Sequence, residues 1–276
     1  AGADQTTVTV TTTAVAAYTT VTLSASNNGN TKTVQLDVVP PSARIRVAPT
    51  SVSGGTNATG TVTLDVPAPV GGYSVALSSD NANATVPASV LVPAGQTSQT
   101  FTVTTNAVTA EVVAYISAST ADQSSEASLT IKPVVPVSVS FTPASVNGGS
   151  PSTGRVTLSS AAPTGGIVVN LTSDSPSATV PSSVTVGAGQ TSVAFVVTTS
   201  TVTADTMATI SGSASGTTVT NGLNIKAIAP TAVTFNPTSV IGGTQTSGTV
   251  TLSGAAPAGG VVVTLSWNSS AAAAPA

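Results

Sequence analysis

The stretch PTSVSGG at residues 49–55 is repeated twice along the chain, as PASVNGG at 143–149 and as PTSVIGG at 237–243, with a step of 94 residues each time. Two more anchors keep this period. The stretch AGQTS at 94–98 returns at 188–192, and a proline stands two residues before a Gly-Gly pair at Pro69, Pro163 and Pro257. Three anchors with one period establish an internal repeat, the signature of a protein built from tandem structural units.

The unit at 137–230 contains seven short runs in which apolar and hydroxyl residues alternate, as they do in half-buried β-strands. Gly- and Pro-containing turns separate the runs, and no segment has a helical period. A unit of this length predicts a two-sheet sandwich of seven antiparallel strands. The residues expected on its core faces, run by run, are Val137, Val139 and Phe141; Val156 and Leu158; Ile167, Val169 and Leu171; Val184 and Val186; Val193, Phe195 and Val197; Ala208 and Ile210; and Leu223 and Ile225.

The pattern PxSVxGG…GxVTLSxxAPxGG…VxLxS…ATVPxSVxVxAGQTSxxFxVTT resembles the bacterial immunoglobulin-like repeats that occur in tandem in large secreted and cell-surface proteins. The resemblance covers essentially the whole chain. It implies an all-β fold of tandem immunoglobulin-like seven-stranded antiparallel β-sandwiches and an extracellular or cell-surface location. It leaves function open, because such modules serve as spacers, adhesin stalks and fibre subunits. The Cys…Trp…Cys core of antibody-type domains is absent.

The repeat divides the chain into four parts. Residues 43–136 and 137–230 are predicted to be complete units, residues 1–42 the last three strands of a unit, and residues 231–276 the first three. Each half-unit alone would expose an apolar sheet face and unpaired strand edges. Two interpretations stay open. The chain is a slice of a longer tandem array, or the C-terminal half-unit of one subunit is completed by residues 1–42 of the next. The second is a head-to-tail contact, which builds an open filament unless it closes into a ring.

Composition excludes most other functions. Of 276 residues only 15 are charged, and histidine and cysteine are absent, so there is no disulfide, no Cys/His zinc site and no Ser-His-Asp triad. Six cations are too few for a nucleic-acid surface, and no apolar run is long enough to span a membrane. Serine and threonine supply 88 of the residues. The surface therefore carries little charge, which favours association between protein molecules. We expect no enzymatic activity and no cofactor or metal. Asp80 and Asp174 are expected to cap local turns rather than to bind calcium.

A few residues are candidates for contacts or modification. Arg44 and Arg46 share one face of a strand, where they contact a neighbouring unit or are simply solvated. Trp267 aligns with Ser79 and Ser173 and is expected in a loop. Two interpretations are open for it: it is an anchor of an interface, or it is an ordinary loop residue. Four Asn-x-Ser/Thr sequences, which such a composition produces by chance, are candidate glycosylation sites: Asn57, Asn83, Asn170 and Asn268.

The sequence therefore predicts a structural subunit of an extracellular bacterial filament or surface fibre, self-associating head to tail, with glycans as candidate partners. The alternative is an adhesin stalk or a glycan-binding module of a large cell-surface protein. Few aromatic residues are available as sugar platforms, since the chain has four Phe, three Tyr and one Trp.

Overall fold

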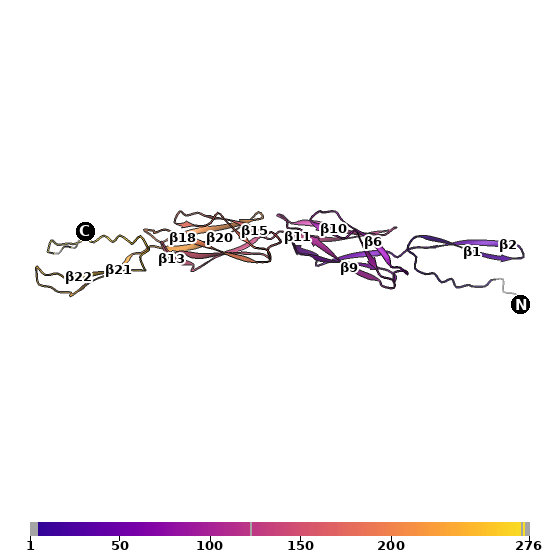
Figure 1. Cartoon of the computed structure of the whole chain (residues 1–276), viewed down its shortest axis with the longest axis horizontal. Coiled ribbons are helices and arrows are strands. Elements are labelled where there is room, and N and C mark those ends of the chain that lie inside the picture. Colours follow the sequence, from indigo (N-terminus) through magenta and orange to yellow (C-terminus); the bar gives the residue numbers. More distant parts are fainter. Residues whose placement is uncertain (1–4, 122, 272, 274–276) are drawn as a thin grey trace. The chain divides into compact units, whose positions relative to one another are not determined.

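The computed structural model describes residues 5–121, 123–271 and 273, in which all regular secondary structure is β-strand. The chain forms two compact units, residues 1–133 and 134–276. Each unit contains one complete sandwich and one of the predicted half-units (Figure 1). The four residues at the N-terminus and the alanine-rich end at 272 and 274–276, both assigned to half-units from sequence, lie outside the described residues.

The first sandwich has nine strands in two sheets. One sheet has the order β3-β5-β9-β7 and the other the order β4-β11-β10-β6-β8. These are the two sheets of an immunoglobulin-like sandwich, with the first, second and fifth long strands side by side in one of them. The strands are β3 (Ala43–Ala48), β4 (Ser51–Ser53), β5 (Ala58–Leu64), β6 (Tyr73–Ser79), β7 (Ala84–Thr85), β8 (Ser89–Val92), β9 (Ser98–Thr105), β10 (Val112–Ser119) and β11 (Ser124–Lys132).

The second sandwich repeats this topology, with sheets β12-β14-β18-β16 and β13-β20-β19-β15-β17. The predicted all-β class and sandwich architecture are confirmed. Each sandwich adds two short strands to the seven predicted, and one of them, β4 or β13, runs parallel to the last strand of its sandwich. The strands are β12 (Pro136–Thr142), β13 (Ser145–Asn147), β14 (Ser152–Leu158), β15 (Ile167–Ser173), β16 (Ala178–Thr179), β17 (Ser183–Val186), β18 (Ser192–Thr199), β19 (Thr206–Ala214) and β20 (Thr217–Lys226).

The core of the second sandwich contains the predicted inward-facing residues with one exception. Val139 and Phe141 of β12 are buried, but Val137 is exposed. The ladder between β12 and β14 shifts register between Pro136 and Ser138, and this bulge turns Val137 outward. The prediction that Val137 lies on the core face is therefore wrong, because strict alternation does not anticipate a bulge.

A glycine under an aromatic ring recurs in both sandwiches. Gly60 lies opposite Phe101, and Gly154 lies opposite Phe195, in the ladder between the second and fifth long strands. A Cβ atom at either glycine would overlap the phenylalanine ring. The absent side chain leaves the space that the ring occupies beside the neighbouring strand.

The substitution Gly154→Ala is therefore expected to destabilise the second sandwich by about 1–3 kcal/mol through overpacking. Thermal unfolding followed by circular dichroism measures this. Gly187→Ala is the matched control, since a Cβ there meets no atom within 4 Å. Equal melting of the two variants would contradict the role given to the ring contact.

Each half-unit forms a hairpin only. The N-terminal half-unit has β1 (Thr19–Asn27) paired with β2 (Asn30–Val38), and the C-terminal half-unit has β21 (Pro230–Asn236) paired with β22 (Ser247–Leu252). The third strand predicted for each half-unit is not formed. Residues 5–18 and residues 261–267, where the sequence predicts these strands, lie outside any strand. These two segments are the main departure from the predicted elements.

Candidate subunit interface

The N-terminal hairpin can be matched residue by residue to the last hairpin of the second sandwich. Both have a two-residue turn in which both residues have positive φ, Asn28-Gly29 in one and Ser215-Gly216 in the other. Because the turns coincide, Leu23 of β1 occupies the position of Ile210 in β19. Ile210 is fully buried, whereas Leu23 is 49% exposed. The half-unit thus presents a core position to solvent.

Neighbouring positions follow the same rule. The matched buried residues are Ala208 for Val21, Leu223 for Leu36 and Ile225 for Val38. Val21 and Leu36 are exposed, and Val38 is half-buried. One side of the β1–β2 hairpin is thus an uncovered core face.

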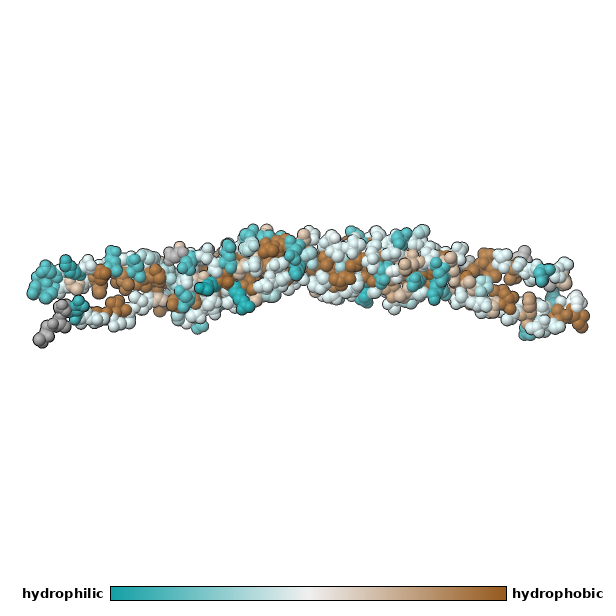
Figure 2. Space-filling view, turned by 180° about the vertical axis from the view of Figure 1, so that it is seen from behind, coloured by the Kyte–Doolittle hydropathy of each residue, from teal (hydrophilic) through white to brown (hydrophobic). Residues whose placement is uncertain are grey.

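The C-terminal hairpin has an uncovered face of the same kind. Each of its residues lies 94 positions after its counterpart in the second sandwich. Phe235 takes the place of Phe141, which is 7% exposed, but is itself 49% exposed. Val233 and Val240 are likewise exposed, although their counterparts Val139 and Val146 are buried. Figure 2 shows hydrophobic side chains at the surface of both terminal segments.

A complete sandwich shows what covers these faces. In the second sandwich β12 packs against β19 and β20 of the opposite sheet, and the Asn221 amide donates a hydrogen bond to the Val139 carbonyl, 2.9 Å away. The counterpart of β12 is β21, and the counterparts of β19 and β20 are β1 and β2. The two uncovered faces therefore correspond to the two opposing sides of a sandwich core.

The same comparison explains why two segments form no strand. Residues 5–12 correspond to β18, whose ladder partners are β14 and β16. Residues 261–267 correspond to β15, whose partners are β17 and β19. The main partner, the counterpart of β14 for residues 5–12 and of β19 for residues 261–267, is not among the strands of the same half-unit. A strand without its ladder partner leaves backbone groups unpaired and is not stable alone.

The carboxylate at the start of the loop after the third long strand does not cap a local turn, so the prediction for Asp80 and Asp174 is wrong. The Tyr115 N–H donates to Asp80 Oδ1 at 2.8 Å, and the Thr209 N–H donates to Asp174 Oδ1 at 2.7 Å. Both bonds reach the neighbouring strand and extend the ladder. No group of three or more Asp or Glu side chains able to hold a metal is found among the described residues.

Trp267 is half-exposed, at 45%, in the segment 261–267. Its counterparts Ser79 and Ser173 end strands β6 and β15 rather than lying in a loop, which corrects the sequence-based placement. In each complete sandwich the serine hydroxyl binds the loop that follows the strand; Ser173 Oγ donates to the Ser175 carbonyl at 3.0 Å. The role of Trp267 as an interface anchor stays a prediction.

Arg44 and Arg46 lie exposed on the outer face of β3, opposite Thr63 and Thr61 of β5. They belong to the first sandwich and not to either uncovered face, and their role in subunit contacts stays a prediction. Of the candidate glycosylation sites, three are exposed and Asn83 is half-buried. The exposed ones are Asn57, Asn170 and Asn268.

The N-terminal hairpin carries one perturbed acid. Hydrogen bonds from Tyr18 and from Thr20, whose Oγ1 lies 2.8 Å from Asp37 Oδ1, hold the pKa of Asp37 below its ordinary value. Asp37 is thus ionised over the whole neutral range, and it joins the start of β1 to the end of β2.

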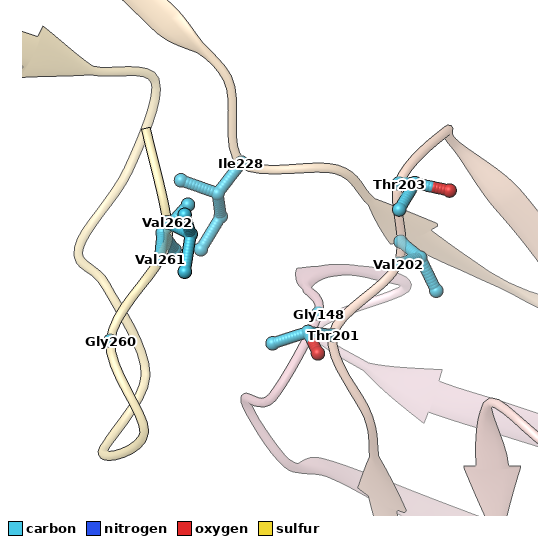
Figure 3. Close-up of a pocket in the computed structure, with 8 residues that line it drawn as sticks. All are labelled: Gly148, Thr201, Val202, Thr203, Ile228, Gly260, Val261 and Val262. Atoms are coloured by element: carbon cyan, nitrogen blue, oxygen red, sulfur yellow. The ribbon is translucent and has the colours of Figure 1, made fainter. Parts of the chain in front are cut away.

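The cavity drawn in Figure 3 is lined by hydroxyl, apolar and glycine residues only. Ile228 lies beside Val261 and Val262, and the opposite wall is made by residues 201–203 and Gly148. It holds no charged group for acid–base chemistry and no aromatic ring on which a sugar could stack. No helix among the described residues is long and apolar enough to cross a membrane.

No family model matches the sequence, and no curated protein matches it. Among solved structures, the adhesin InvE of Yersinia pseudotuberculosis is similar over 74% of this chain and 71% of its own, at 15% identity and a TM-score of 0.35. Domains 4 and 5 of the S-layer protein SbsC are similar over 67% of this chain and 98% of their own, at 19% identity and a TM-score of 0.32. At these scores the likeness adds nothing to the strand order described above.

The exposed apolar residues of the half-units are not among the candidates that the sequence predicts, which are a lone tryptophan and two arginines. Leu23, Leu36 and Phe235 are ordinary core residues, and only their exposure distinguishes them. Aligning each half-unit to the core positions of the complete units is the signal that finds them.

Proposed function

We propose that this chain is a structural, non-catalytic subunit of an extracellular filament or surface fibre, in which sandwich units are joined end to end. The observation that carries the proposal is the pair of uncovered faces, one on each half-unit, which match the two opposing sides of a sandwich core. Burying that area is the driving force for association, at roughly 25 cal/mol per Å² of apolar surface.

In the proposed assembly, the C-terminal half-unit of one copy and the N-terminal half-unit of the next form a joint sandwich. The contact is heterologous, because different surfaces of the two copies meet, and such contacts continue indefinitely unless a ring closes. The low charge supports the assignment, since side-by-side and end-to-end contacts between copies meet little repulsion. A hydroxyl-rich surface without cysteine or histidine suits an extracellular material.

Removal of residues 1–42 tests the proposal. The remaining chain keeps both complete sandwiches, whose separate cores span Ala43–Ile131 and Val134–Ile225. We expect folded monomers by sedimentation and no filaments by electron microscopy. A second variant lacking residues 231–276 should also be monomeric, and mixing the two variants should give a one-to-one dimer that grows no further.

Filaments formed by the variant without residues 1–42 would contradict the proposal. The chain would then fit a stalk in which sandwiches act only as spacers. Binding of a sugar by the monomeric variants on a glycan array would favour the glycan-binding alternative.

A further inference from the structure

We infer that the joint sandwich forms by a two-way exchange of strands with a defined register: residues 5–12 of one copy join the ladder of β22 in the next, and residues 261–267 of that copy join the ladder of β1 in the first. The inference rests on the proposed function and specifies how its contact is made. The partner is a second copy of this chain.

The first ladder follows from both complete sandwiches. Gly154 pairs with Phe195, and Gly60 pairs with Phe101. The N-terminal hairpin match relates Phe195 to Val8, and the 94-residue repeat relates Gly154 to Gly248. Both pairs therefore place Val8 opposite Gly248. The two complete sandwiches thus give the same register, with Thr7 opposite Thr249 and Thr9 opposite Ser247.

The side chains of residues 5–12 fit this role. Val8 and Val10 correspond to Phe195 and Val197, both buried, yet Val8 is 72% exposed and Val10 is also exposed. Threonines alternate with them, so that a strand here has one apolar and one hydroxyl face. Gly248 takes the place of Gly154, which lies beneath the Phe195 ring; in the free half-unit the Phe235 ring lies beside Gly248, 3.2 Å from where a Cβ would be.

The second ladder follows in the same way. Ser173 pairs with Ile210, and Ser79 pairs with Ile116. The corresponding pair in the joint sandwich is Trp267 with Leu23, so the lone tryptophan ends the incoming strand beside an uncovered core residue. Asn268 then stands where Asp174 stands, with its amide oxygen placed to accept the Thr22 N–H in place of the bond from Thr209.

A third contact completes the joint. β13 runs parallel to β20, with Val146 opposite Ile225. The corresponding residues are Val240 in one copy and Val38 in the other. All three ladder contacts therefore link residues on different half-units, which in the proposed assembly belong to two copies.

Cysteine pairs test the register directly, because the natural chain has no cysteine. Chains carrying Thr7→Cys are mixed with chains carrying Thr249→Cys and oxidised. Opposed residues in an antiparallel pair have Cα atoms about 4.5–5.5 Å apart, within reach of a disulfide. The second ladder is tested by Ser24→Cys mixed with Ser266→Cys. We expect both mixtures to give covalent dimers on non-reducing gels, and each variant alone to give few.

The matched control is Thr11→Cys mixed with Thr249→Cys. Thr11 lies on the same face of the strand, but four residues from Thr7 and so about 13 Å away along it. We expect at least tenfold less cross-linking from this pair. Equal cross-linking of control and test pairs, or filaments that form without cross-linking of either test pair, would overturn the register and leave the proposed function standing. Absence of any self-association would overturn both. A chain carrying both Thr7→Cys and Thr249→Cys that cyclises instead of polymerising would overturn exchange between copies.

Discussion

The substitution Leu23→Asp is expected to abolish filament assembly while leaving both complete sandwiches folded. Leu23 is half-exposed in the free chain, so a carboxylate there costs the monomer little. In the joint sandwich it would take the place of the fully buried Ile116 and Ile210. A buried, unpaired carboxylate costs several kcal/mol. Because each 1.4 kcal/mol is a tenfold change, self-association should weaken by at least about a hundredfold.

Sedimentation velocity and electron microscopy measure the assembly, and circular dichroism measures the folding of the monomer. The matched control is Thr33→Asp, which adds the same charge at an exposed position of β2 whose counterpart in the second sandwich, Thr220, is also exposed. Filaments of normal length from the Leu23→Asp variant would show that this face is not buried on assembly.

The second large effect concerns two phenylalanines at matched positions in the repeat. Phe141→Ala removes a buried ring from the second sandwich and should destabilise it by about 3–5 kcal/mol. Phe235→Ala should leave the thermal unfolding of the monomer almost unchanged, because Phe235 has no covered core to lose. In the assembled state the order reverses, and Phe235→Ala should weaken the joint strongly.

Two measurements separate the effect on monomer stability from the effect on assembly. Thermal unfolding is measured at a protein concentration too low for filaments to form, and the lowest concentration at which filaments appear is measured for each variant. Equal destabilisation of the monomer by both substitutions would mean that Phe235 is already covered in the single chain. That result would contradict completion by a second copy.

Most of the two complete sandwiches could be predicted from sequence, because alternation of apolar residues marks each long strand. Ile210 and Leu223 are fully buried as expected. The departures have local causes. Val137 is turned outward by a bulge, and the two-residue strand β7 is too short to have a period. The hydrogen bond from the Tyr115 N–H to the Asp80 carboxylate joins residues 35 positions apart in the sequence, a separation at which a sequence pattern predicts no geometry.

The half-units show a different limit. Residues 5–12 have the alternation of a strand, and they are expected to become one. A β-strand forms only beside a neighbouring strand that pairs with its backbone groups. Val8 and Val10 lack a neighbouring backbone within their own half-unit, and the pattern of apolar residues says nothing of where that neighbour is. The lone Trp267 and the arginine pair are rare residues in this sequence, whereas the uncovered faces consist of residues as common as leucine and valine.

The parallel neighbours β13 and β20 carry a mechanical consequence. The chain enters the second sandwich through β12 and β13 and leaves through β20, so a pull on its two ends slides β13 along β20. Such shear loads all their hydrogen bonds together, whereas peeling would break them one at a time. In the joint sandwich the corresponding segments, around Val240 and Val38, belong to different copies. Tension along the fibre would then cross from one molecule to the next through a pair of parallel strands loaded in shear.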